Sequence, residues 1–222
     1  MDSSQDIAED YLWTLCRTLS RELKDSAAVM STVERLEDHA KGFPEVRFCK
    51  GCVLPVLDRV TTEFFNTRLS LSSKEAHAAL RCEGASTLPS IYAPGDGQSG
   101  FSGVTWGTNH QSSGKGGGKR KSLPCPDFGV VHLGTPSLTI LGETKYVTRA
   151  VSRDRLLAMI TKDMDDYMAV ERDAELGWHY EFGIGIAFRP SADRLLNVEV
   201  LTQQWAKKRY FIMLFHPSQR GE

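Results

Sequence analysis

The sequence predicts a mixed α/β domain preceded by helices. Apolar residues recur at helical spacing through the first third of the chain. After residue 127, short runs rich in β-branched and aromatic residues predict strands, and a single helical segment lies between them. Helices followed by strands with an intervening helix indicate a mixed sheet covered by helices rather than a helical bundle.

The composition of the chain excludes several classes of protein. The 222 residues carry 27 basic and 28 acidic side chains, so the net charge of -1 does not indicate any class of binding partner. The chain lacks the compositional bias of a collagen, a coiled coil or a wholly disordered protein. No apolar run approaches the roughly 20 residues that cross a bilayer, so we expect no membrane partner. Five cysteines and an acidic, polar start predict reduced thiols and an intracellular protein.

The N-terminal third contains several helical patterns. The clearest stripe includes Tyr11, Leu15 and Leu19. Ser26 is the expected cap of the second helix, which Gly42 and Pro44 would end. The expected helices cover residues 7–23, 26–40, 53–69 and, as a short element, 73–82.

A glycine-rich basic segment separates the helices from the strands. Nine glycines lie between Gly95 and Gly118, and the segment ends in a lysine and arginine cluster at residues 115–121. Such a sequence buries too little apolar surface to offset its ordering entropy, so a mobile loop is expected over residues 95–121. Residues 87–92 and 101–106 both have the composition of a strand.

The remaining chain predicts a hairpin, a helix and further strands. The hairpin strands cover residues 127–133 and 138–146, with a Gly-Thr-Pro turn between them. Ser152 is the expected cap of a helix that continues to about residue 172. The later strands are expected at residues 182–188, 195–201 and 210–215.

The hairpin gathers three charged residues on one face. If its turn is centred on Thr135, Asp127 lies opposite Glu143, and opposed residues point to the same side of a sheet. Lys145 follows Glu143 by two residues, so strand alternation puts it on that face as well. Two adjacent carboxylates repel each other unless a cation lies between them. Carboxylate oxygens suit Mg²⁺ or Mn²⁺, and a lysine beside such an ion can orient or deprotonate an attacking water.

Pro126-Asp127, fifteen intervening residues and Glu143-Thr144-Lys145 resemble the signature of the PD-(D/E)XK nuclease superfamily. The predicted order of helix, hairpin, helix and strand also resembles its α-β-β-β-α-β core. The resemblance covers about residues 53–188. It implies a restriction-endonuclease-like mixed sheet over residues 53–222, with residues 1–52 as an N-terminal helical extension. It also implies a metal-dependent nuclease that hydrolyses phosphodiester bonds, with DNA favoured over RNA.

The resemblance assigns roles to individual residues. Asp127 and Glu143 would bind Mg²⁺ or Mn²⁺ through their carboxylates, and the backbone carbonyl of Thr144 would be a further ligand. Lys145 would position the water. Many members of the superfamily add an acid from the first core helix, for which Glu63 is the first choice and Glu75 the second.

Basic side chains near these residues are expected to contact the nucleic-acid backbone. They are Lys115, Lys119, Arg120 and Lys121 in the glycine-rich loop, and Arg149 and Arg153 after the proposed lysine. Many nucleases of this superfamily act as dimers, so the sequence leaves open whether this protein forms a homodimer.

Two other function classes also stay open. The chain could keep the fold as a non-catalytic nucleic-acid-binding or assembly module. Alternatively, Cys49 and Cys52 follow a strand-like segment, residues 45–48, and open a helix, an arrangement that resembles a thioredoxin active site. A thiolate at a helix N-terminus has a lowered pKa and is reactive.

Overall fold

The computed structural model describes residues 4–37, 44–70, 80–82, 126–132, 138–168, 181–192 and 195–218. The helices are α1 (Ser4–Leu23), α2 (Ser26–Glu37), α3 (Pro44–Phe48), α4 (Leu54–Arg68) and α6 (Arg153–Met168), with a π-helical turn η1 (Cys49–Val53) between α3 and α4. The strands are β1 (Leu80–Cys82), β2 (Phe128–His132), β3 (Leu138–Tyr146), β4 (Phe182–Phe188), β5 (Asn197–Trp205) and β6 (Lys208–His216).

The strands form one mixed sheet in the order β1-β2-β3-β4-β6-β5. The pairs β1–β2, β2–β3 and β5–β6 are antiparallel, whereas β3–β4 and β4–β6 are parallel. Parallel neighbours need a crossover connection, and α6 supplies it between β3 and β4. The fold is therefore mixed α/β, as the sequence predicts.

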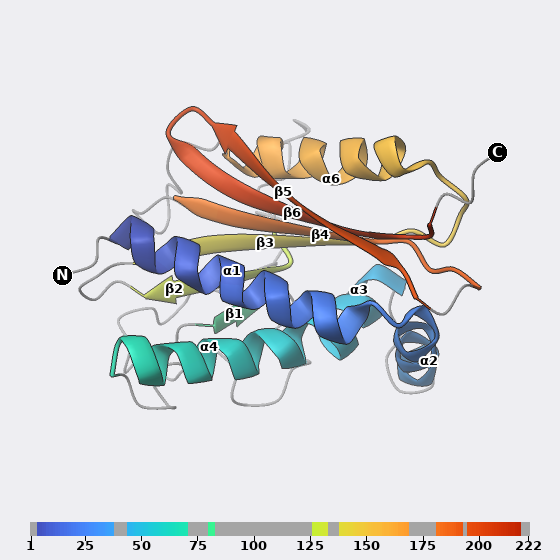
Figure 1. Cartoon of the computed structure of the whole chain (residues 1–222), viewed down its shortest axis with the longest axis horizontal. Helices are drawn as coiled ribbons and strands as arrows, with labels where there is room; N and C mark the ends of the chain where they lie inside the picture. Colours follow the sequence, from blue (N-terminus) through green and yellow to red (C-terminus); the bar gives the residue numbers. More distant parts are fainter. Residues whose placement is uncertain are drawn as a thin grey trace, which may run out of the picture.

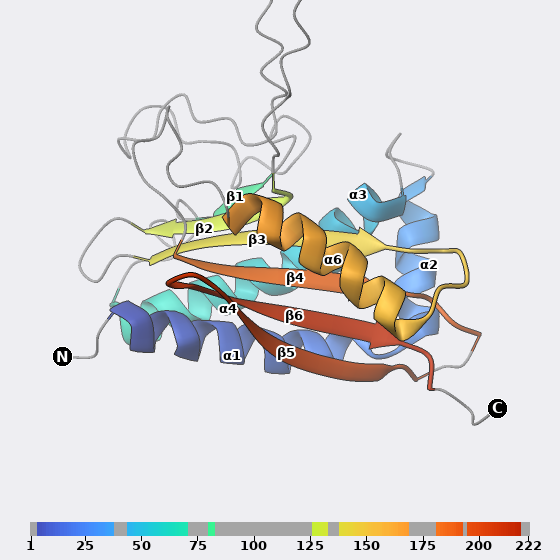
Figure 2. The same ribbon diagram turned by 90° about the horizontal axis from the view of Figure 1, so that it is seen from above.

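Helices cover both faces of this sheet. Helices α1 and α4 lie on one face and α6 lies across the other (Figures 1 and 2). Alternation along β3 divides its side chains between two hydrophobic clusters. Ile140 packs with α1 and α4, and Leu141 packs with α6. Residues 143 and 145 continue the alternation of Leu141, so their side chains lie on the α6 face.

Glycines on β4 let α6 approach this face closely. A Cβ on Gly185 would lie 2.6 Å from Cγ1 of Ile160 and 3.0 Å from Cγ of Met164. Because neither contact leaves room for a methyl group, a side chain here would push the helix away. Gly185 pairs with Glu143 in the parallel ladder, so this close contact between α6 and the sheet lies beside the predicted metal ligand.

Most predicted elements are confirmed, and three details are wrong. Residues 80–82 form a strand rather than the end of a helix, and they pair with β2. Residues 45–48 are helical rather than strand-like. The side chain that caps α2 is Asp25, whose Oδ1 accepts the Ala28 amide at 3.2 Å, while Ser26 bonds to the backbone of Ser191.

The N-terminal helices share the core of the sheet. Fully buried side chains of α1, among them Leu12 and Leu15, belong to the same hydrophobic cluster as Phe48 and Ile184. The proposed division at residue 52 stays a prediction, but the packing of residues 4–37 joins them to the sheet. Within the described part of the chain, no helix is both long enough and apolar enough to span a membrane.

Candidate metal centre

The register of the β2–β3 pair sets the positions of the first two acids of the site, Asp127 and Glu143. Phe128 pairs with Gly142, the register predicted for a turn centred on Thr135. Strand β2 begins at Phe128, so Asp127 lies just beyond its end, beside the part of β3 that β2 leaves unpaired. There the Asp127 carboxylate accepts the Thr144 amide at 2.7 Å and the Thr144 hydroxyl at 2.5 Å. Asp127 thus replaces the missing strand as the partner of Thr144 and is held firmly.

Glu143 and Lys145 lie together on the α6 face. The Lys145 Nζ is 2.9 Å from Oε1 of Glu143, which confirms that these side chains share one face. Glu143 is 5% exposed. A carboxylate this buried needs a positive partner, and Lys145 provides one.

The third acid is Glu45, at the start of α3. Its Oε1 is 3.0 Å from the Lys145 Nζ. One carboxylate oxygen each from Glu45, Asp127 and Glu143 lies within 4.8 Å of the other two. Sequence analysis missed Glu45 because it interprets residues 45–48 as a strand. The helix signal is present, since Pro44 occupies the first helical position and an acid follows it in the first turn.

Helix α6 adds two side chains at i, i+4 spacing. The Asp163 carboxylate lies 3.0 Å from the Lys145 Nζ, and the Tyr167 hydroxyl donates to Oε2 of Glu143 at 3.0 Å. Residues four apart on a helix share one side, so both reach the same patch of sheet. Sequence analysis did not single out either residue for the site.

The carboxylates are electrostatically crowded. Burial, reinforced by the Asp127 charge, raises the pKa of Glu143 above the ordinary carboxyl range. Burial also raises the pKa of Asp127, although its hydrogen bonds from Thr144 oppose the change. The surrounding carboxylates outweigh burial at Lys145 and raise the pKa of its ammonium, which therefore stays charged at neutral pH.

These three acids fit a small divalent cation. Two oxygens bound to one Mg²⁺ at about 2.1 Å lie at most about 4.2 Å apart, so the observed spacing needs only small side-chain rotations. The acids come from a helix, a strand start and a mid-strand position, and oxygen donors of this kind suit Mg²⁺ or Mn²⁺. A divalent charge would also relieve the repulsion between Asp127 and Glu143.

The structure does not bring Glu63 to this cluster. Glu63 is exposed on α4, where it lines a surface hollow with Asp10 and Arg68. Glu63 lies 18 residues after Glu45 in the sequence, a separation equivalent to about five turns of helix. Glu75, the second choice, lies outside the described residues.

The predicted basic contacts fall into two groups. Lys115, Lys119, Arg120 and Lys121, with the whole of the 95–121 loop, lie outside the described residues. Arg149 is exposed just after β3. The Arg153 guanidinium already binds the carboxylates of Glu199 and Asp154, at 2.5 and 3.0 Å.

The cysteine pair has little of the character of a redox site. Cys49 and Cys52 lie in η1 and are 5% and 7% exposed. Burial raises the pKa of the Cys52 thiol to about 12, the opposite of the shift that activates a thiolate.

Comparison of the chain with protein-family models, with curated proteins and with solved structures gives no match.

Proposed function

We propose that this protein is a divalent-metal-dependent nuclease of the PD-(D/E)XK type. The observation that carries the proposal is the meeting of Glu45, Asp127 and Glu143 within 4.8 Å, beside the Lys145 ammonium. The order of elements supports it as well. A helix precedes three strands that pair antiparallel in sequence, and α6 then leads to β4, which is parallel to β3. Among the described elements, this succession agrees with the α-β-β-β-α-β order that the family resemblance implies.

In this proposal Glu45, Asp127 and Glu143 hold the Mg²⁺ or Mn²⁺, with the Thr144 carbonyl as the further ligand that the motif suggests. The bound ion would supply a polarised water and offset negative charge that develops on the scissile phosphate. The Lys145 ammonium is charged, so we assign it to orienting the water and stabilising the pentavalent phosphate rather than to removing a proton. Asp163 and Tyr167 would hold Lys145 and Glu143 in position.

DNA is the favoured substrate, by resemblance to the superfamily alone. Arg149 is the exposed basic residue nearest in sequence to the proposed lysine among the described residues, and we assign it to a phosphate contact. The alternative is a nucleic-acid-binding or assembly module without catalysis. A thiol oxidoreductase is the weakest candidate, because Cys49 and Cys52 are buried.

Cleavage of labelled single- and double-stranded DNA and RNA, in Mg²⁺, Mn²⁺ or EDTA, tests the proposal. We expect metal-dependent cleavage that Asp127→Asn or Glu143→Gln abolishes together with metal binding. Lys145→Ala should keep metal binding and lower the cleavage rate by about 10²–10⁴-fold. Wild-type turnover in Lys145→Ala would refute the role of that lysine. Absence of cleavage of every substrate, with metal bound, would favour the non-catalytic module.

Glu45 and Glu63 form a matched pair for the identity of the third acid. We expect Glu45→Gln to weaken Mn²⁺ binding in calorimetry by at least about tenfold, because one of three charged ligands becomes neutral. Glu63→Gln makes the same chemical change on α4, outside the cluster, and should leave Mn²⁺ affinity unchanged. Equal affinities of the two variants would remove Glu45 from the site.

A further inference from the structure

We propose that Lys145 competes with the metal for its ligands: it leaves Glu45 and Glu143 when a divalent ion binds, and Asp163 then keeps it beside the ion. Asp163 is thus a positioning residue for the reaction. The inference rests on the proposed function, from which it takes the metal ligands. It is carried by the donors of the ammonium, by the two oxygens of Glu143 and by the excess of acids around Lys145.

All three donors of the Lys145 ammonium are engaged by carboxylates. A lysine ammonium has three N–H groups. The Lys145 Nζ lies 2.9 Å from Glu143 and 3.0 Å from both Glu45 and Asp163. Three contacts use three donors, so no N–H group is left for a water or a phosphate oxygen. Lys145 can therefore take the role proposed for it only after it has lost at least one of these contacts.

The contacts of Glu143 indicate which of them are lost. Its Oε1 accepts from the Lys145 ammonium at 2.9 Å, and its Oε2 accepts from the Tyr167 hydroxyl at 3.0 Å. A divalent ion on this carboxylate repels the ammonium but not the neutral hydroxyl. The same holds at Glu45, because its Oε1 also accepts from the Lys145 ammonium. We therefore expect Lys145 to lose its contacts with both metal ligands when the ion binds.

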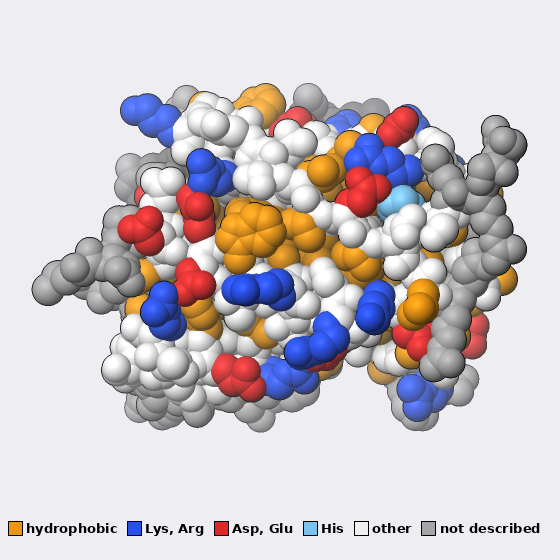
Figure 3. Space-filling model, in the orientation of Figure 1, with side chains coloured by type: hydrophobic (Ala, Val, Ile, Leu, Met, Phe, Trp, Pro, Cys, Tyr) orange, Lys and Arg blue, Asp and Glu red, His pale blue; other side chains and the backbone are white. Residues whose placement is uncertain are grey.

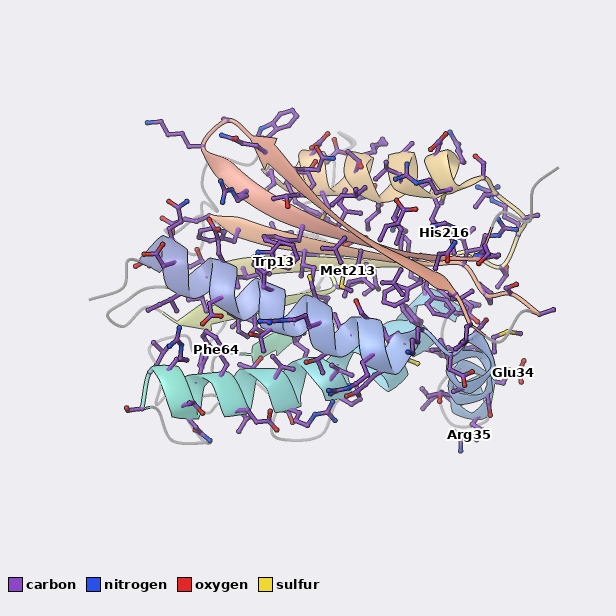
Figure 4. All side chains as sticks on the ribbon, in the orientation of Figure 1. Trp13, Glu34, Arg35, Phe64, Met213 and His216 are labelled. Atoms are coloured by element: carbon purple, nitrogen blue, oxygen red, sulfur yellow. The ribbon has the colours of Figure 1, made fainter. Side chains whose placement is uncertain are left out.

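The acids around Lys145 outnumber the base. On the face of α1 and α4, which Figure 3 shows, acidic and basic side chains are interspersed. Glu199 on β5 lies between two basic side chains, Arg153 and His216, the second of which Figure 4 labels. Around Lys145 the ratio is reversed, since one ammonium contacts three carboxylates. A second cation is therefore favourable here, and the ammonium can stay beside it.

Asp163 is the carboxylate that remains to Lys145 when the ion binds. It is not one of the three acids whose oxygens meet within 4.8 Å, yet its Oδ2 lies 3.0 Å from the Lys145 Nζ. With Glu45 and Glu143 on the ion, Asp163 occupies one N–H group, and two become available for the water and the scissile phosphate. Without Asp163, the ammonium would stay on the metal ligands, and the centre would bind the ion less tightly.

The Mn²⁺ affinity of the full-length chain, measured by calorimetry without nucleic acid, tests the competition. Lys145→Met removes the charge and keeps the length of the side chain, so we expect it to tighten Mn²⁺ binding by at least about tenfold. Lys162→Met makes the same change on the exposed side of α6, where Lys162 pairs with Asp166, and should leave the affinity unchanged. Unchanged or weaker Mn²⁺ binding in Lys145→Met would overturn the proposal.

Substitutions of Asp163 test its positioning role. We expect Asp163→Asn to lower Mn²⁺ affinity by about tenfold, and Asp163→Glu, which keeps the carboxylate, to restore most of it. Asp166→Asn is the matched control on the exposed side of α6 and should change nothing. In the Lys145→Met background, the loss caused by Asp163→Asn should shrink by at least about fivefold, because no ammonium is left to hold. An equal loss in both backgrounds would overturn the positioning role of Asp163.

The same measurements separate this inference from the nuclease assignment. Tight Mn²⁺ binding by the wild-type chain that neither Lys145→Met nor Asp163→Asn alters would overturn the inference alone. Absence of Mn²⁺ binding by the wild-type chain would overturn both. If Lys145→Met unfolds in EDTA because its carboxylates lack a cation, Mn²⁺ should restore its circular dichroism spectrum. Should it stay unfolded, Asp163→Asn and Asp166→Asn decide, and equal Mn²⁺ affinities of these two variants would overturn the proposal.

Discussion

The Lys145 Nζ lies 2.9 to 3.0 Å from carboxylate oxygens of Glu45, Glu143 and Asp163. Sequence reasoning could place Asp127, Glu143 and Lys145, because strand alternation and hairpin register are local properties of nearby residues. It could not place Glu45 or Asp163. Their positions depend on how α3 and α6 pack on the sheet, and the contact between Glu45 and Lys145 spans 100 residues.

The first prediction concerns the pH dependence of stability without metal. Because the folded state raises the pKa of Glu143, the unfolded chain releases this proton at lower pH than the folded chain does. The protonated Glu143 carboxyl makes its full contribution to the free energy of unfolding below the ordinary carboxyl pKa. That contribution is lost as pH rises through the raised pKa. Denaturant unfolding in EDTA at several pH values should therefore show wild-type stability falling above about pH 4.5, and falling less in Glu143→Gln.

The metal supplies the control for that measurement. Divalent ions bind the deprotonated carboxylates, so Mn²⁺ should stabilise the wild-type protein more at pH 8 than at pH 5. Glu143→Gln should lose most of this gain. Identical pH profiles for the wild-type protein and Glu143→Gln in EDTA would show that Glu143 is not held in its protonated form.

At the scale of elements, the sequence predicts the periodic helices and the central strands correctly, and it is wrong in the short ones. Strands β2, β3, β4 and β6 carry strong apolar patterns. Residues 80–82 form only a three-residue strand, whose pairing with β2 is a tertiary contact. Residues 45–48 are too few to show a helical period, so their apolar spacing does not distinguish strand from helix.

The second prediction concerns the contact between α6 and β4. We expect Gly185→Ala to lower the free energy of unfolding by about 1–3 kcal/mol, because the added methyl meets Ile160 and Met164. Displacement of α6 should also weaken the contact between Tyr167 and Glu143, and so reduce Mn²⁺ affinity. Denaturant melts and calorimetry measure both effects.

Ile160→Ala removes the nearest clashing atom and provides a double-mutant test. The combined Gly185→Ala, Ile160→Ala protein should be more stable than the sum of the two single changes predicts. Strict additivity would mean that the methyl group added at position 185 and the Ile160 side chain do not compete for the same space.

At the scale of the whole molecule, helices pack against both faces of a single sheet. Tyr11 of α1 bonds to Thr61 of α4 at 2.9 Å inside the cluster that also contains Ile184 and Phe215 of the sheet. Composition and pattern predict the mixed α/β class, but not which helix covers which face. That choice depends on the joint packing of residues far apart in the chain.

The third prediction treats α1 as part of the folded core. Leu15 is fully buried, so Leu15→Ala should lower the free energy of unfolding by about 2–5 kcal/mol in a single cooperative transition. Arg17, exposed on the same helix, is the control, and Arg17→Ala should change stability by no more than about 0.5 kcal/mol. A separate early transition in Leu15→Ala would show instead that residues 1–52 fold as an independent extension.

The long separation between Glu45 and the hairpin has a consequence for the order of folding. The contact between Asp127 and Thr144 closes a loop of 17 residues, whereas the contact between Glu45 and Lys145 closes one of 100. Chain entropy makes the longer closure about 1.6 kcal/mol less favourable, so we expect the hairpin to form first and α3 to dock late. A nascent chain would then carry two carboxylates of the proposed centre before the third arrives, and the divalent-ion affinity that we propose for it would develop only once α3 has docked.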